Sequence, residues 1–122
     1  MPTHTPPLLW QESADRLVLD DTHSVEILSE SDPGIQAVHL PGEHTRKNAW
    51  LAVQALHQIL PTIELEEIIE VISKFPGTNR RFEKISENLY SDYAHHPVEI
   101  AATIQAAQEI NKNVVVIYQP HQ

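Results

Sequence analysis

The sequence contains no cysteine, only three glycines among its 122 residues, and no long apolar run. The lack of cysteine excludes a disulfide scaffold and a thiolate metal site, and it fits a reducing compartment. No apolar stretch approaches the roughly 20 residues that a membrane-spanning helix needs. With so few glycines, the chain has no Gly-x-x-x-x-Gly-Lys-Ser/Thr loop of the kind that cradles nucleotide phosphates. Its first residues also lack the basic and apolar regions of a signal peptide.

Basic residues are scarce as well. Eight Lys and Arg stand against 17 Asp and Glu, which gives a formal net charge of −9. This balance argues against nonspecific nucleic-acid binding, because such binding depends on neutralising phosphates. Half of the basic residues nevertheless fall within eleven positions, as Lys74, Arg80, Arg81 and Lys84. In an acidic protein this cluster indicates a local anion site, and a solvated patch on a loop is an equally simple interpretation.

The N-terminal part of the sequence predicts an antiparallel meander. Two turn-forming segments, Asp20-Asp21-Thr22-His23 and Asp32-Pro33-Gly34, separate three short stretches of alternating polarity. The expected strands cover residues 16–20, 24–29 and 36–40. The proline-rich residues 1–14 are interpreted as an arm or an incomplete element.

Two helices are expected next, because the spacing of apolar residues changes to that of a helix. The first begins at Thr45, its expected N-cap, and ends before Pro61. The second covers residues 64–73, and its glutamates form a solvated face. The residues expected to face inward are Ala49, Trp50, Val53, Leu56 and Leu60 in the first helix and Leu65, Ile68, Ile69 and Ile72 in the second.

The segment Phe75-Pro76-Gly77 interrupts the second helix and marks the expected boundary between a domain of residues 1–74 and one of residues 75–122. Beyond it, a strand near 88–91, a helix from Pro97 to about Ile110 and the apolar run 114–118 predict a βαβ unit. The expected fold class is therefore α/β: an antiparallel meander plus two helices, followed by the βαβ start of a Rossmann-like doubly wound sheet. Because two strands and one helix cannot bury such a sheet, we expect a piece of a larger protein, with an open sheet edge that favours self-association.

A polar cluster follows the predicted strand at 88–91. Asp92, His95 and His96 lie just before the expected helix, at the place where open α/β sheets bind ligands. Helix capping by these residues is the alternative interpretation. A metal-dependent hydrolase is a further alternative, but adjacent helical residues point about 100° apart and no HExxH or Cys pair supplies more ligands. We therefore expect no metal site in this chain.

Two more segments carry polar residues suited to a nucleotide. Phe75-Pro76-Gly77-Thr78-Asn79-Arg80-Arg81-Phe82-Glu83 places paired arginines after a glycine turn, and arginine matches phosphate oxygens in a bidentate manner. Gly42-Glu43-His44-Thr45-Arg46-Lys47-Asn48-Ala49 opens the first predicted helix. Its Asn48 amide can offer a donor and an acceptor to a base edge. A capped amphipathic helix accounts for the second segment equally well.

In this order and at these spacings, the three segments resemble the Mur ligases, ATP-dependent enzymes that build the peptide stem of peptidoglycan. The strongest match is Asp92-Tyr93-Ala94-His95 together with the arginine segment, while Thr45 and Ser91 depart from the family pattern. The double histidine and the late Tyr118-Gln119-Pro120-His121 look most like the branch that joins L-alanine to UDP-N-acetylmuramate. The resemblance implies that residues 1–74 end the central ATPase domain and that residues 75–122 start the C-terminal domain.

The resemblance also implies roles for single residues. Arg81 would contact a nucleotide phosphate, and His44 and Asn48 would flank the adenine. Asp92 and His95 would line the cleft where the amino acid docks, so the catalytic candidates are Arg81, Asp92 and His95. The complete cytoplasmic enzyme would use ATP and Mg²⁺, with the metal ligands and the phosphate loop outside this chain, and the chain alone is expected to be inactive. A murein tripeptide recycling ligase of the same family and a non-catalytic nucleotide- or protein-binding module stay open as alternatives.

Overall fold

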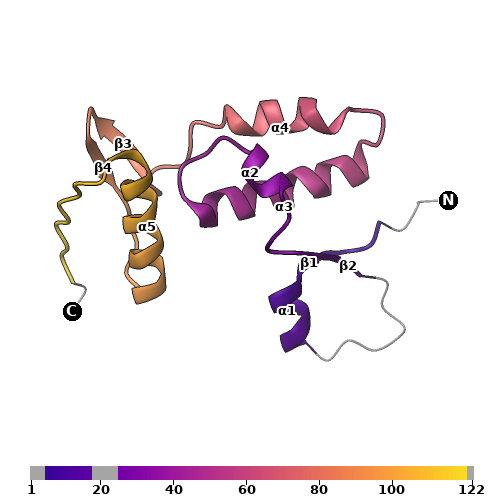
Figure 1. Cartoon of the computed structure of the whole chain (residues 1–122), viewed down its shortest axis with the longest axis horizontal. Coiled ribbons are helices and arrows are strands. Elements are labelled where there is room, and N and C mark those ends of the chain that lie inside the picture. Colours follow the sequence, from indigo (N-terminus) through magenta and orange to yellow (C-terminus); the bar gives the residue numbers. More distant parts are fainter. Residues whose placement is uncertain (1–4, 18–24, 121–122) are drawn as a thin grey trace.

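A computed structural model describes residues 5–17 and 25–120, and it shows a mixed α/β protein with two small sheets. The elements are β1 (Leu8–Trp10), α1 (Gln11–Arg16), β2 (Glu26–Leu28), α2 (Gly34–Ala37), α3 (Glu43–Ile59), α4 (Leu65–Ser73), β3 (Glu83–Ser86), β4 (Leu89–Ser91) and α5 (Pro97–Ile110). Figure 1 shows α1 to α4 with β1 and β2 as one group, and β3, β4 and α5 as a second group beside the start of α3. None of the helices in the described ranges is both long enough and apolar enough to cross a bilayer.

The main hydrophobic core lies where α3 packs against α4 and α2 (Figure 1). Val53 of α3 is completely buried, and the Trp50 ring beside it is 4% exposed. The predicted inward side of α4 is confirmed, and its glutamates are exposed. Leu56 and Leu60, also predicted to face inward, are exposed, so the apolar stripe of α3 is covered along only part of its length. The core consists of Ile35, Val38, Trp50, Val53 and Ile68, with Leu65, Ile69 and Ile72 partly buried against it.

Helix α3 begins earlier than the sequence predicts. Its N-cap is Gly42, with φ 84°, and Thr45 lies inside the helix, so the prediction of Thr45 as N-cap was wrong. The Gly42 N–H donates to Oε2 of Glu109 at 3.0 Å, and the Glu43 N–H donates to Oε1 of Gln105 at 3.2 Å. Because the first amides of a helix need acceptors, two side chains of α5 take the role expected of a local residue.

The predicted antiparallel meander was wrong. Strand β1, which lies in the supposed arm, pairs in parallel with β2, and Leu9 is opposite Ile27. The third expected strand begins inside α2, where the Asp32 carboxylate accepts the Gly34 N–H at 2.8 Å and starts a helical turn. Residues 18–24, which hold most of the first expected strand and its turn, lie outside the described residues, as do residues 1–4 and His121.

The second group follows Gly77. The strand expected near 88–91 is confirmed as β4 and the helix from Pro97 to Ile110 as α5, but β4 pairs antiparallel with β3 rather than with the run at 114–118. That run forms no strand in the structure, and Val115 and Ile117 are 91% and 96% exposed. A parallel strand needs paired neighbours, and within the described ranges this run has none. The predicted βαβ unit is therefore absent from the described residues, and the doubly wound sheet and the domain boundary stay predictions.

Candidate functional site

Arg81 lies on a tight turn between Gly77 and β3. The residues on either side of it, Arg80 and Phe82, have φ values of 58° and 49°. This left-handed region is disfavoured for residues with a side chain, most of all for bulky ones. The Thr78 carbonyl accepts the Arg81 N–H at 3.1 Å and closes the turn. Such a backbone conformation persists only where surrounding contacts hold it, so the hydrogen bonds to this turn determine its stability.

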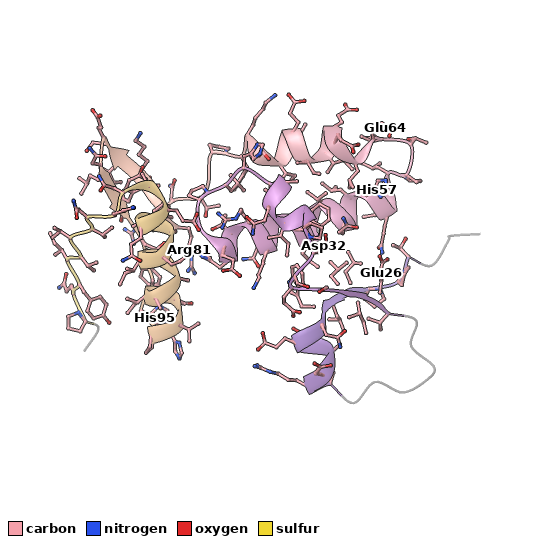
Figure 2. All side chains as sticks on the ribbon, in the orientation of Figure 1. Glu26, Asp32, His57, Glu64, Arg81 and His95 are labelled. Atoms are coloured by element: carbon pink, nitrogen blue, oxygen red, sulfur yellow. The ribbon has the colours of Figure 1, made fainter. Side chains whose placement is uncertain are left out.

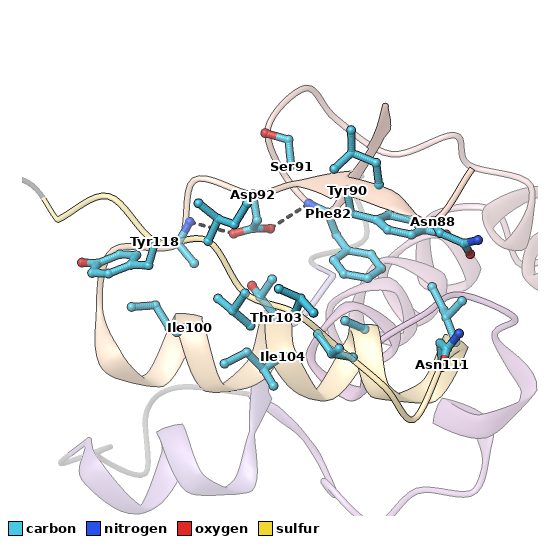
Figure 3. Close-up of a pocket in the computed structure, with 18 of the residues that line it drawn as sticks. Phe82, Asn88, Tyr90, Ser91, Asp92, Ile100, Thr103, Ile104, Asn111 and Tyr118 are labelled. Carbon is cyan, nitrogen blue, oxygen red and sulfur yellow. Dashed lines mark hydrogen bonds between the residues drawn. The ribbon is translucent and has the colours of Figure 1, made fainter. Parts of the chain in front are cut away.

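The Asp92 carboxylate is one of the groups that hold this turn. Its Oδ2 accepts the Phe82 N–H at 2.7 Å, and its Oδ1 accepts the Ala94 N–H at 2.7 Å (Figure 3). The Arg80 carbonyl also accepts the Tyr93 N–H at 2.9 Å. The sequence offered Asp92 either as a helix cap or as a ligand-contacting carboxylate. In the structure it joins the Arg81 turn to the end of β4.

The cap of α5 is His96 instead. Its Nδ1 accepts the Val98 N–H at 3.4 Å, and the Glu99 carboxylate accepts the N–H of His96 at 3.4 Å, which makes a capping box. The expected capping role of His96 is thus confirmed. The pKa of the Glu99 carboxyl lies below its usual value because the His95 and then the His96 amides donate to it, with smaller contributions from the charges of His95 and Arg81. Figure 2 shows Arg81 and His95 together in the second group of elements, with β3, β4 and α5.

His95 is held next to this cap. Its Nδ1 lies 3.3 Å from the Tyr93 carbonyl oxygen and 3.6 Å from Oε2 of Glu99, and its side chain is about half exposed. The Tyr93 and His95 rings are 5.5 Å apart and tilted by 59°. Across residues 5–17 and 25–120, no group of three or more His, Cys, Asp or Glu side chains is arranged to hold a metal ion.

A cavity of about 260 Å³ lies between the β3–β4 hairpin, α5 and residues 113–118 (Figure 3). Asp92 lines it together with Phe82, Tyr90 and the apolar residues of α5. Arg81 and His95 are outside this lining. The structure thus links the backbone beside Arg81 to Asp92, but it does not gather Arg81, Asp92 and His95 around this cavity.

His44 and Asn48, the other two predicted site residues, lie on the first turns of α3. Nε2 of His44 is 3.3 Å from Oγ1 of Thr45, and the Asn48 side chain is exposed. They are therefore placed at the end of α3 that contacts α5. Which face of a nucleotide they would meet stays a prediction.

The sequence interpretation missed the contact that fixes this end of α3. Nη1 and Nη2 of Arg46 donate to Oε2 and Oε1 of Glu109 at 2.7 and 3.0 Å, and Nη1 also donates to the Leu40 carbonyl at 3.0 Å. The Arg46 guanidinium lowers the pKa of Glu109 to about 2, helped by the Gly42 amide and by Gln105. The two partners are separated by 63 positions, and no local pattern links them.

Comparison with known proteins gives matches to curated ligases. The chain is 40% identical over 87 residues to the UDP-N-acetylmuramate–L-alanine ligase of Cereibacter sphaeroides, which covers 67% of this chain and 18% of the relative. It is 38% identical over 93 residues to the ligase of the same name from Desulforamulus reducens, which covers 72% of this chain and 20% of the relative. This chain belongs to the Mur ligase family. No family model and no solved structure matches it.

The Mur ligase relatives are much longer than this chain. It spans about a fifth of the length of the curated relatives it matches, so they extend well beyond the region compared. The likeness drawn from the three motif segments is thereby confirmed at the level of the family. The roles of Arg81, Asp92, His95, His44 and Asn48 stay predictions.

Proposed function

We propose that this chain is part of an ATP-dependent ligase that joins L-alanine to UDP-N-acetylmuramate in peptidoglycan biosynthesis. The observation that carries the proposal is the 38–40% identity to curated ligases of that name. We also propose that residues 1–74 end the central ATP-using domain and that residues 75–122 start the C-terminal domain. In such an enzyme, movement about Gly77 would bring the two parts together around the substrates.

The proposed reaction has two steps. A muramoyl carboxylate oxygen attacks the γ-phosphorus of ATP, and the bond to the ADP oxygen breaks, which gives an acyl-phosphate and ADP. The amine of L-alanine then attacks the acyl carbon, inorganic phosphate leaves, and the amine loses a proton as the amide forms. Because both steps concentrate negative charge on phosphate oxygens, a guanidinium close to them lowers the barrier.

The side chains of this chain fit part of that task. Arg81 is exposed, and in the described part of the chain no salt bridge engages its guanidinium. Its donors are therefore suited to phosphate oxygens. His44 and Asn48 are exposed polar residues at the start of α3 and would face the adenine. The Asp92 carboxylate is occupied by two backbone amides, so we expect the Mg²⁺ ligands in another part of the ligase.

The test is an assay of ADP release by the full-length protein that carries this segment. We expect release that requires UDP-N-acetylmuramate, L-alanine and Mg²⁺ together. Replacing L-alanine with the murein tripeptide should abolish it, and efficient use of the tripeptide would favour the recycling ligase instead. No release with any amino-acid or peptide substrate, while a nucleotide still binds, would favour the non-catalytic module.

A pair of variants tests the arginine. We expect Arg81→Ala to lower kcat/KM by about 100-fold or more, the typical loss when one donor to a developing negative charge is removed. Arg80→Ala is the matched control, since it removes the same charge from the neighbouring position, and it should have a much smaller effect. Equal losses in both variants would assign the effect to the turn as a whole.

A further inference from the structure

We propose that Asp92 is a positioning residue: its carboxylate fixes the left-handed turn that presents Arg81, and it acts on a bound phosphate only through that arginine. The positioning is a property of the fold. The link to phosphate rests on the proposed function. This assignment differs from the expectation that Asp92 itself lines the substrate cleft.

The first support is the occupancy of the carboxylate. Each oxygen of Asp92 accepts one backbone N–H at 2.7 Å, from Phe82 on one side and from Ala94 on the other. Charge-assisted bonds of this length are the strong kind, and both are partly buried. Asp92 thereby ties together two backbone segments that are twelve positions apart in the chain. Since His96 caps α5, capping does not explain Asp92.

The second support is the conformation that Asp92 holds. Arg80 and Phe82 both have positive φ, which residues with side chains adopt only under constraint. Besides the Thr78–Arg81 bond, three contacts act on the same turn. The Arg80 carbonyl accepts from Tyr93, the Arg80 N–H donates to Glu83 at 2.9 Å, and the Phe82 ring stacks on Tyr90 with centroids 4.7 Å apart. The Asp92 bond enters at the Phe82 N–H, directly after Arg81. Its loss would let this backbone relax.

The third support is the place of the anchored Phe82 amide, directly before the β3–β4 hairpin. Phe82 precedes β3, and β3 pairs with β4, so the anchored amide sets the position of Arg81 relative to the whole hairpin. Asp92 thus holds the backbone from which the Arg81 side chain extends.

Hydrogen exchange of single amides in the 122-residue chain tests the positioning directly. Asp92→Ala should speed exchange of the Phe82 and Ala94 amides by at least about tenfold while the buried Val53 amide is unchanged. Asp92→Asn keeps one oxygen acceptor, so it should speed exchange at only one of the two amides, and it serves if the alanine variant unfolds. Glu87→Gln, a carboxylate change in the same hairpin, is the control and should alter none of them. Unchanged exchange at both Phe82 and Ala94 in the Asp92 variants would overturn the proposal.

A suppressor separates positioning from direct contact with substrate. Glycine adopts a φ near 58° without steric cost, so adding Arg80→Gly to Asp92→Asn should slow the faster exchange again. In the full-length ligase, Asp92→Asn should raise KM for ATP, and the same suppressor should restore part of the loss. Asp92→Asn should add nothing to Arg81→Ala, because both act through one guanidinium. Fully additive losses, or failure of the suppressor in both assays, would show that Asp92 acts on the substrate itself. If the protein proves not to be a ligase, the exchange results still decide the positioning.

Discussion

Glu109 is expected to hold the two groups of elements together, and Glu109→Gln tests this. The substitution keeps the shape of the side chain and removes its charge. Four donors use that carboxylate: the Gly42 N–H, both terminal nitrogens of Arg46 and the side-chain amide of Gln105. The glutamine side chain can accept only some of these hydrogen bonds, because its terminal NH₂ group is itself a donor.

The size of the effect follows from the pKa of the carboxyl. A value of about 2 in the folded protein, against an ordinary 4.5, corresponds to about 3 kcal/mol. Because the Glu109 side chain keeps 30% exposure, solvent screening reduces this figure, and we expect a loss of about 1 to 2 kcal/mol in the free energy of unfolding. Folding lowers this pKa, so the contribution is complete above pH 4.5 and disappears as the pH falls toward about 2.

Urea unfolding at neutral pH and near pH 2 measures both the size of this loss and its dependence on pH. Tryptophan fluorescence reports on the α3 core, because Trp50 is buried in it and Trp10 packs against it. Far-ultraviolet circular dichroism reports on all helices. We expect the difference between wild type and Glu109→Gln to be present at neutral pH and absent in acid. Glu70→Gln is the control, because its pair with Lys74 is about 70% exposed on both sides and should contribute nothing measurable. A difference that persists in acid, or an equal loss in the control, would refute the reasoning.

Two further predictions concern packing. Ile35→Ala should lower the free energy of unfolding by about 3 kcal/mol, because Ile35 is 2% exposed in the core, whereas Val71→Ala, at 65% exposure on α4, should change it little; urea midpoints compare the two. Gly42→Ala and Gly77→Ala share a positive φ, but only at position 42 would the new Cβ lie 2.8 Å from another atom, the Cβ of Ala106. We therefore expect a larger drop in Tm for Gly42→Ala, and equal drops would argue against the close approach of α3 and α5.

The sequence predicted the elements whose limits are set locally. Helix α5 was predicted over its full length, because Pro97 favours a first turn and the apolar spacing continues to Ile110. Helix α4 was predicted within one residue for the same kind of reason. The start of α3 was placed wrongly, since its amides find their acceptors on α5, more than 60 positions away. Alternating polarity also misled in the N-terminal part, where the partner of β2 is β1, in the proline-rich segment.

In the candidate site, too, the sequence predicted local features but not contacts between distant residues. Motif segments indicated which residues carry polar chemistry, and they led to the family. They did not show that Asp92 is bound to the amide of Phe82, or that Arg46 meets Glu109, because such partners depend on how the chain turns in space. A residue type at a given spacing predicts which interactions a side chain can make. The hydrogen bonds in the folded protein determine which of those interactions it does make.

The start of α3 has one more consequence. Its first amides donate to side chains of α5, which follows Gly77 in the chain. These amides therefore gain their hydrogen-bond acceptors only when α5 packs against α3. Parting the two groups would return those amides and the Arg46 guanidinium to water at the same moment. The ordering of the first turn of α3, which lies nearest the proposed nucleotide, is therefore coupled to the packing of α5. A substitution in either helix would shift both.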